Sequence, residues 1–146
     1  MSGIIGSAGT KSGVIRAHAN ESNLWHLRYV STGLTINSSA QAITDLACTY
    51  SYERTHALHI TGCLTMTSSA AFDSHVGILL NGTQIGSPDQ HYTPDGEWWY
   101  MSWSFMSATQ TAGTHAVTVI GTNQMSDWNI IASAANSQQV VRIIPQ

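Results

Sequence analysis

The stretch LHITGCLTMT, residues 58–67, determines the class of fold, because large apolar residues alternate in it with small polar ones. In an extended chain, successive side chains point to opposite faces. One face then carries Leu58, Ile60, Gly62, Leu64 and Met66, and the other carries His59, Thr61, Cys63, Thr65 and Thr67. This period of two is typical of a half-buried antiparallel β-strand.

Similar extended segments recur on both sides of this stretch. They are predicted at residues 24–30, 47–54, 75–85, 98–106, 115–121, 128–132 and 140–144. Asn81-Gly82 between apolar residues predicts a tight hairpin turn, whose two central residues need positive φ. Only residues 39–46 and 133–138 are compatible with a helical turn. About eight short strands separated by turns predict an all-β antiparallel β-sandwich or jelly roll, without fixing the strand order.

Composition divides the chain into two parts. Residues 1–13 contain four Gly and three Ser around the apolar pair Ile4-Ile5, and such a segment forms no element of its own. We therefore expect an extended N-terminal arm over residues 1–15 and a single β-sandwich domain over residues 16–146. The start lacks the basic end and apolar block of a secretory signal, so we expect synthesis in a cytosol.

The low content of charged residues excludes several classes of protein. Charged residues make up 9% of the chain, against about 25% in an ordinary soluble domain. Five Lys and Arg residues are too few for binding nucleic acid by phosphate neutralisation. No apolar run approaches the roughly 18 residues that membrane insertion requires. Cys48 and Cys63 either pair or remain as small buried thiols.

The sequence carries no pattern that is typical of catalysis or of a cofactor. His56 and His59 are three residues apart, which places them on opposite faces of a strand, and no third metal ligand has a familiar spacing. The segment GSAGTKSG, residues 6–13, lacks the glycine that precedes the lysine of a phosphate-binding loop. Most carboxylates fall in predicted turns. We therefore expect no enzymatic activity, no cofactor and no metal site.

The aromatic residues concentrate in the segment 98–106. Trp99, Trp103 and Phe105 share one face of this predicted strand with Met101 and are expected to fill the core. Trp98 and Tyr100 then point outward. Exposed aromatic rings of this kind are typical of subunit interfaces and of platforms for the apolar faces of sugars.

A surface with few charges lacks much of the repulsion that keeps proteins apart. The composition therefore predicts a homo-oligomer, which we expect to be a trimer around a threefold axis. His18, His26 and His115 are expected at the subunit contacts, where a neutral imidazole forms hydrogen bonds readily.

Two segments resemble known proteins. The start GIIGSAGTKSGVI, residues 3–15, resembles the opening of small virion proteins of tailed bacteriophages. The stretch GTHAVTV, residues 113–119, with the last predicted strand at 140–144, is similar to the late strands of jelly rolls of the tumour-necrosis-factor and C1q type. The resemblance implies a trimeric virion accessory protein, of the capsid decoration or fibre type, and it supplies no catalytic residues.

We accordingly expect a capsid decoration (cement) protein that binds the outer surface of a phage head and stabilises it. The arm residues Ile4, Ile5, Val14 and Ile15 would contact the major capsid protein or another virion protein. The alternative is a tail-fibre, spike or head-fibre tip that contacts the host surface or a glycan, through Trp98 and Tyr100. Either protein would be made in the host cytoplasm and end in the virion. A cellular lectin-like module and a polysaccharide hydrolase are the remaining hypotheses.

Overall fold

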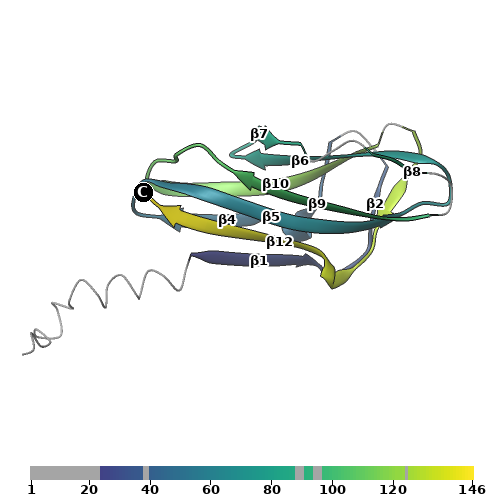
Figure 1. Ribbon diagram of the computed structural model, residues 1–146, viewed down its shortest axis with the longest axis horizontal. Coiled ribbons are helices and arrows are strands. Elements are labelled where there is room, and N and C mark those ends of the chain that lie inside the picture. Colours follow the sequence, from purple (N-terminus) through teal and green to yellow (C-terminus); the bar gives the residue numbers. More distant parts are fainter. Residues whose placement is uncertain (1–23, 38–39, 88–90, 94–96, 124) are drawn as a thin grey trace, which may run out of the picture.

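The computed structural model describes residues 24–37, 40–87, 91–93, 97–123 and 125–146. The predicted arm, with Ile4, Ile5, Val14 and Ile15, lies outside the described residues, as do His18 and the domain boundary predicted after residue 15. The described chain forms antiparallel strands in two stacked sheets (Figure 1). The predicted all-β antiparallel class is confirmed.

The first sheet has a four-stranded body in the order β1 (Trp25–Val30), β12 (Ser133–Pro145), β5 (His56–Thr67) and β9 (Trp98–Met106). The strand β12 therefore lies between β1 and β5 (Figure 1). β12 pairs with β5 only as far as Cys63. Beyond it, the short strand β11 (Trp128–Ile130) pairs with β5, and β2 (Leu34–Ile36) pairs with the other edge of β11.

The second sheet is built around β10 (Gly113–Asn123) and β6 (Phe72–Leu80). On one side β10 pairs with β3 (Gln41–Ala42) and β4 (Cys48–Tyr52), which are separated by a 3-10 turn at Thr44–Leu46. On the other side β6 pairs with β7 (Thr83–Gly86) and β8 (His91–Thr93). Along the sequence the chain passes repeatedly from one sheet to the other, which is the path of a jelly roll.

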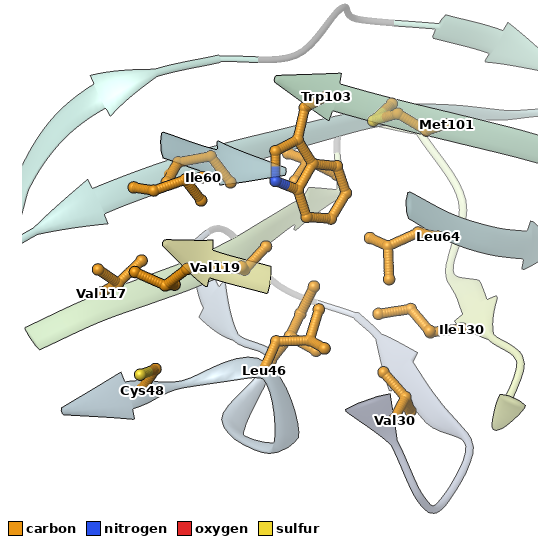
Figure 2. Close-up of a cluster of buried hydrophobic side chains, with 14 of the residues drawn as sticks. Val30, Leu46, Cys48, Ile60, Leu64, Met101, Trp103, Val117, Val119 and Ile130 are labelled. Carbon is orange, nitrogen blue, oxygen red and sulfur yellow. The ribbon is translucent and has the colours of Figure 1, made fainter. Parts of the chain in front are cut away.

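The core lies between the two sheets and confirms the alternation predicted for β5. Leu58, Ile60, Leu64 and Met66 are fully buried, whereas most residues on the other side of β5 are partly exposed. Figure 2 shows Ile60 and Leu64 on one layer of this core and Val117 and Val119 of β10 on the other. Each fully buried side chain of this size contributes about 1.5–3 kcal/mol to folding.

Gly62 interrupts the apolar series of β5 because the indole of Trp103 occupies the space beside it. A Cβ atom added at Gly62 would lie 2.2 Å from Cζ2 of Trp103 and 2.7 Å from the carbonyl oxygen of Gln138. Real Cβ atoms do not approach other atoms so closely, and the backbone oxygen cannot move aside cheaply. The indole of Trp103 therefore packs directly over Gly62 on the neighbouring strand, where a glycine leaves room for it.

The predicted hairpin at Asn81-Gly82 is confirmed. Asn81 has φ of 52° and Gly82 has φ of 81°, and Leu80 pairs with Thr83 across the turn. The segment predicted at residues 98–106 has the same bounds as β9. A helical turn was also considered for residues 39–46. The structure has the strand β3 and the 3-10 turn at Thr44–Leu46 in this segment.

The helical turn considered for residues 133–138 is wrong, because this segment is the beginning of β12. Gln138 pairs with Cys63 of β5 on one side and with Tyr29 of β1 on the other. These long-range pairs hold the segment extended although its own sequence, SAANSQ, has no apolar alternation. Tertiary pairing here outweighs local preference.

The two cysteines are free thiols. Cys48 is buried in β4 of the second sheet, and Cys63 is half-buried in β5 of the first sheet. Burial raises the pKa of the Cys48 thiol, although the positive charge of Arg28 acts in the opposite direction. Among the described residues, no helix has the length and apolar character needed to cross a membrane.

Candidate interaction face

The outer surface of the first sheet, which we call the β1–β9 face, is assembled by strand register. Residues that pair directly point to the same side of a sheet, so Trp25, Arg142, His59 and Met106 form one row across four strands. Parallel rows follow along the strands. Other outward residues of the face include Leu27, Tyr29, Thr61, Cys63, Thr65, Thr67, Trp98, Tyr100, Ser102, Ser104, Gln138 and Val140.

This face gathers most of the exposed apolar surface of the described chain. Six of the seven large hydrophobic side chains that are exposed there belong to it: Trp25, Leu27, Tyr29, Trp98, Tyr100 and Met106. The seventh is Met125, outside the face. Trp25 is 62% exposed and Tyr100 is 63% exposed. A cluster of this kind on one surface of a soluble protein is typical of an interaction site.

The predicted division of the aromatic residues in β9 is confirmed. Trp103 and Met101 are buried in the core, and Trp99 and Phe105 pack against it from a half-buried position. Trp98 and Tyr100 lie outside. Trp25, Leu27 and Tyr29 were not predicted to belong to an exposed face, although they alternate with the more polar His26 and Arg28. That alternation was visible, but the usual preference for apolar residues inside gives the wrong orientation for β1.

The exposed apolar side chains form two separate patches on the face. Trp25, Leu27 and Tyr29 form the β1 patch, and Trp98 and Tyr100 form the β9 patch. Met106 lies at the other end of β9, in the row of Trp25. Between them lie the mostly small and neutral residues of β12 and β5. Three strand spacings separate β1 from β9, which corresponds to about 14 Å.

The polar residues of the face are held by contacts within it. Arg142 is the only charged side chain among them, and its guanidinium lies 5.3 Å from the centroid of the Trp25 ring. A guanidinium in this position is attracted by the face of the indole. Nε2 of His59 lies 2.9 Å from the hydroxyl of Ser104. The face is therefore nearly neutral and lacks the like charges that would oppose contact with a second copy.

His115 and His26 were expected at subunit contacts. For His115 this expectation is wrong. This histidine is 7% exposed, and its ring stacks on Tyr50 inside the subunit. Its Nε2–H donates to the carbonyl of Thr111 at 3.0 Å, and its Nδ1 accepts from the amide of Asn81 at 3.0 Å. Partners within the subunit satisfy both nitrogens. His26 is half-buried beside the same Tyr50 ring.

His56 is fully buried in the same cluster. Its Nδ1 lies 2.8 Å from the carbonyl of Arg54, so Nδ1 carries the proton. Its Nε2 then accepts a hydrogen bond from the hydroxyl of Tyr50 at 2.9 Å. Burial raises the pKa of Tyr50, which keeps the phenol protonated as that donor. As predicted, His56 and His59 point to opposite sides of β5.

Within the described ranges, no group of three or more His, Cys, Asp or Glu side chains is placed to hold a metal ion. The features that distinguish the β1–β9 face are its shape and its apolar patches. Such a surface suits a broad partner that covers it and excludes water.

No family model matches the chain, and no curated protein matches its sequence. Solved structures do resemble it. The TNF Eiger of S. frugiperda is 9% identical over 84% of this chain and 94% of its own, with a TM-score of 0.55. A chain of infectious bursal disease virus, strain Gx, is 12% identical over 84% of this chain, with a TM-score of 0.46. The match spans 37% of that viral chain.

A carbohydrate-binding module, CBM36, solved with calcium and xylotriose, is 13% identical over 81% of this chain and 98% of its own, with a TM-score of 0.38. At such identities a likeness concerns the fold alone. Together with the strand order, the likeness to Eiger leads to one conclusion: the chain is an antiparallel jelly roll similar to that of a tumour necrosis factor.

Proposed function

We propose that the chain is a structural virion protein that forms a homotrimer through the β1–β9 face and decorates the outside of a bacteriophage capsid. The observation that carries the proposal is the concentration of six exposed apolar side chains on one nearly neutral face. The low charge of the whole chain and the phage-like start at residues 3–15 support it further.

Self-association follows from the layout of the face. Covering its half-exposed aromatic and aliphatic side chains contributes about 1 kcal/mol or more for each of them. The β1 patch and the β9 patch differ in shape and lie on opposite sides of the face. Unlike patches favour a head-to-tail contact, in which the β1 patch of one copy meets the β9 patch of the next. Such contacts close into a ring when the rotation between copies fits.

The association is tested by measuring the mass of the full chain in solution by light scattering and sedimentation. We expect three copies for the native chain and a folded monomer for the double variant Trp25→Ser, Tyr100→Ser. Met125→Ser, which removes an apolar side chain of 58% exposure outside the face, serves as the matched control and stays trimeric. A native chain that is monomeric at tens of micromolar, or a double variant that remains trimeric, contradicts the proposal.

Attachment to the capsid is assigned to the predicted arm, with Ile4 and Ile5 as its apolar contacts. Glycines beside an apolar pair let a segment bend into a neighbouring pocket or sheet edge. Three arms on one trimer multiply attachment, so no single contact needs to be tight. By bridging capsomers, the trimers would stabilise the shell against internal pressure.

The arm is tested by mixing purified protein with phage heads that lack it and imaging them by electron cryomicroscopy. We expect density at regular positions over the icosahedral shell. A variant without residues 1–13 should remain a folded trimer, because the described sandwich does not include them, but should leave the shells bare. Capsid binding by this shortened variant contradicts the role of the arm.

A fibre or spike tip that binds a host glycan is the second candidate, and one observation favours it. Trp98 and Tyr100 are two residues apart on β9, about 7 Å along the strand, and both are more than half exposed. Two rings at this spacing suit consecutive sugar units. Density confined to a tail, together with glycan-array binding that Trp98→Ala abolishes, would favour this candidate over decoration.

A further inference from the structure

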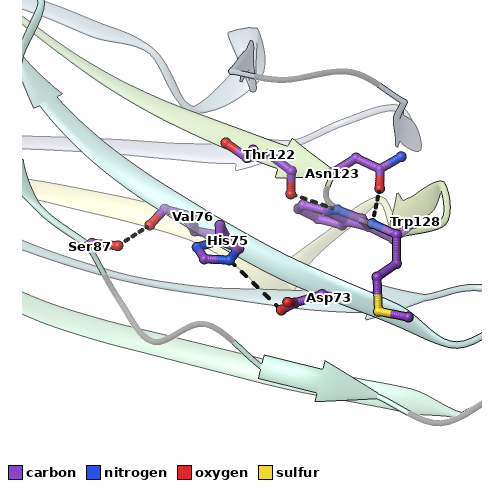
Figure 3. Close-up of polar contacts among 8 residues, drawn as sticks. Asp73, His75, Val76, Ser87, Thr122, Asn123 and Trp128 are labelled. Atoms are coloured by element: carbon purple, nitrogen blue, oxygen red, sulfur yellow. Dashed lines mark hydrogen bonds and ion pairs between the residues drawn. The ribbon is translucent and has the colours of Figure 1, made fainter.

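The second sheet carries a hollow on its outer face, on the side opposite the β1–β9 face. It lies over Gly77 in the middle of β6 and has a volume of about 150 Å³. Figure 3 shows three of the residues that line it, His75, Ser87 and Thr122. The lining residues are His75, Val76, Gly77, Gln84, Ser87, Ile120 and Thr122.

Glycine is what keeps the hollow open. Gly77 pairs with Ile120 of β10, and a Cβ atom added at Gly77 would lie 2.9 Å from Cγ1 of Ile120 and 3.6 Å from Cδ of Gln84. A side chain at position 77 would therefore occupy the space and would require the Ile120 side chain to shift. The floor of the hollow is therefore backbone and one aliphatic side chain.

His75 is the chemically active group at the rim. Its Nε2 lies 3.9 Å from Oδ1 of Asp73, two residues earlier on the same strand, a distance longer than a hydrogen bond (Figure 3). A carboxylate facing one ring nitrogen favours the proton on that nitrogen, which leaves the other as an acceptor. Within the described part of the chain, no hydrogen bond holds Nδ1 of His75. This nitrogen is available to a ligand that donates.

The remaining rim is rigid and neutral. The Nε1–H of Trp128 donates to the carbonyl of Thr122 at 3.3 Å, and the hydroxyl of Ser87 donates to the carbonyl of Val76 at 3.3 Å (Figure 3). No hydrogen bond to another described residue uses the hydroxyl of Thr122 or the amide of Gln84. Both groups can therefore donate to a ligand or accept from it.

The charges around the hollow select the class of ligand. None of the arginines that the structure describes lines it, so an anion finds no partner there. No carboxylate belongs to the lining residues, and the nearby Asp73 carboxylate faces His75, so a cation is not favoured either. An apolar floor with acceptors and donors at the rim fits a ring that has an apolar face and several hydroxyl groups.

We propose that the hollow over Gly77 binds one ring of a neutral, hydroxyl-rich molecule, a single saccharide unit, with a ligand hydroxyl donating to Nδ1 of His75. The apolar face of the ring packs on Ile120. The volume lies below the roughly 300–1,000 Å³ of a pocket that encloses a drug-sized ligand, so one unit is held and binding is weak. The site is independent of the β1–β9 face and of the proposed capsid role.

The test is an NMR titration of the isotope-labelled full chain with glucose, galactose and N-acetylglucosamine, and with glucuronate and ethanolamine as charged probes. We expect at least one neutral sugar to shift the signals of His75, Gly77 and Thr122. His75→Phe, which keeps a ring but lacks the acceptor, should weaken binding roughly threefold to tenfold, the effect of one lost hydrogen bond. Gly77→Ala should abolish it.

His59→Ala, on the opposite face, is the matched control and should bind as the native chain does. The proposal is overturned if no neutral sugar shifts these three signals, or if only the charged probes bind. It is also overturned if the shifts are confined to Trp98 and Tyr100, which would locate sugar binding on the β1–β9 face. Unchanged affinity in a folded His75→Phe variant would remove the assigned role of Nδ1.

Discussion

Tyr50 is the residue whose ionisation the fold changes most clearly. It is 3% exposed, and its hydroxyl donates to the buried Nε2 of His56. Burial raises the pKa of the phenol, with a further contribution from the nearby Cys48 thiol. A pKa that is higher in the folded chain than in the unfolded chain stabilises the fold below the unfolded value, near pH 10, and this contribution is lost as the pH rises above it.

We therefore expect the free energy of unfolding to fall as the pH is raised from about 9 to about 11, since the pKa of Cys48 is raised too. Tyr50→Phe should lower the free energy of unfolding by about 1–2 kcal/mol at neutral pH, because Nε2 of His56 loses its donor. The free energy of unfolding of this variant should fall less steeply with pH in alkali than that of the native chain. Urea unfolding at several pH values measures both effects. Parallel curves for the native chain and the variant would show that Tyr50 does not titrate with unfolding.

Whether a side chain is buried or exposed could be predicted from the sequence for some residues and not for others. Trp98 and Tyr100 were assigned correctly, because alternation along one strand suffices to separate inside from outside. The position of His115 was not predictable in this way. Its partners Asn81 and Thr111 meet it only through the turn after β6 and the segment before β10, so its burial depends on the topology of the sheet.

Among the connecting elements, the β6–β7 turn does more than reverse the chain. The side-chain oxygen of Asn81 accepts from the backbone N–H of Ala116 at 2.9 Å, and its amide donates to Nδ1 of His115 at 3.0 Å. The backbone N–H of Asn81 also donates to the carbonyl of Ala116 at 2.8 Å. The turn thus fastens β6 to the beginning of β10, which a local sequence signal for a hairpin does not reveal.

Two variants separate these roles. Asn81→Gly keeps the backbone freedom that a φ of 52° requires but loses the amide contacts, and should destabilise the fold by about 1–3 kcal/mol. Asn81→Ala loses the same contacts and also strains the turn, which adds roughly 1 kcal/mol. Chemical unfolding of both variants is the measurement. If Asn81→Gly is as stable as the native chain, the contacts to β10 contribute nothing.

The strands that alternation identified are the long ones, because a period of two needs several residues to be visible. The strands β2, β3 and β8 have two or three residues each and gave no such signal. The beginning of β12 was missed for another reason, since its buried residues include the polar Ser137. Strand order remained open because the pairing of Trp25 with Arg142 joins the two ends of the described chain.

At the scale of the whole molecule, Cys63 reports on the β1–β9 face. It lies near the middle of the face, in a row with Gln138 and Ser102, and is half-buried within a single subunit. A second copy that covers the face would shield this thiol. Cys48 lies in the core of the subunit and is shielded whether or not copies associate.

We expect Cys63 to react slowly with a thiol reagent in the native chain and at least several-fold faster in the variant Trp25→Ser, Tyr100→Ser. Timed labelling followed by peptide mass spectrometry gives the rate at each cysteine. The slow reaction of Cys48 should be the same in both proteins and serves as the internal standard for intact folding. Equal rates at Cys63 would mean that the face is open to solvent in the native chain.

The central place of β12 has a consequence for the order of events during synthesis. A ribosome that adds about 5–20 residues per second needs roughly 7–30 s for 146 residues. Until β12 is made, β1 has no strand to pair with, because its partner β12 is the last described strand to leave the ribosome. The β1 patch therefore cannot take its place on a finished sheet while the chain is still being made. Association of copies through the β1–β9 face would therefore follow the synthesis of β12.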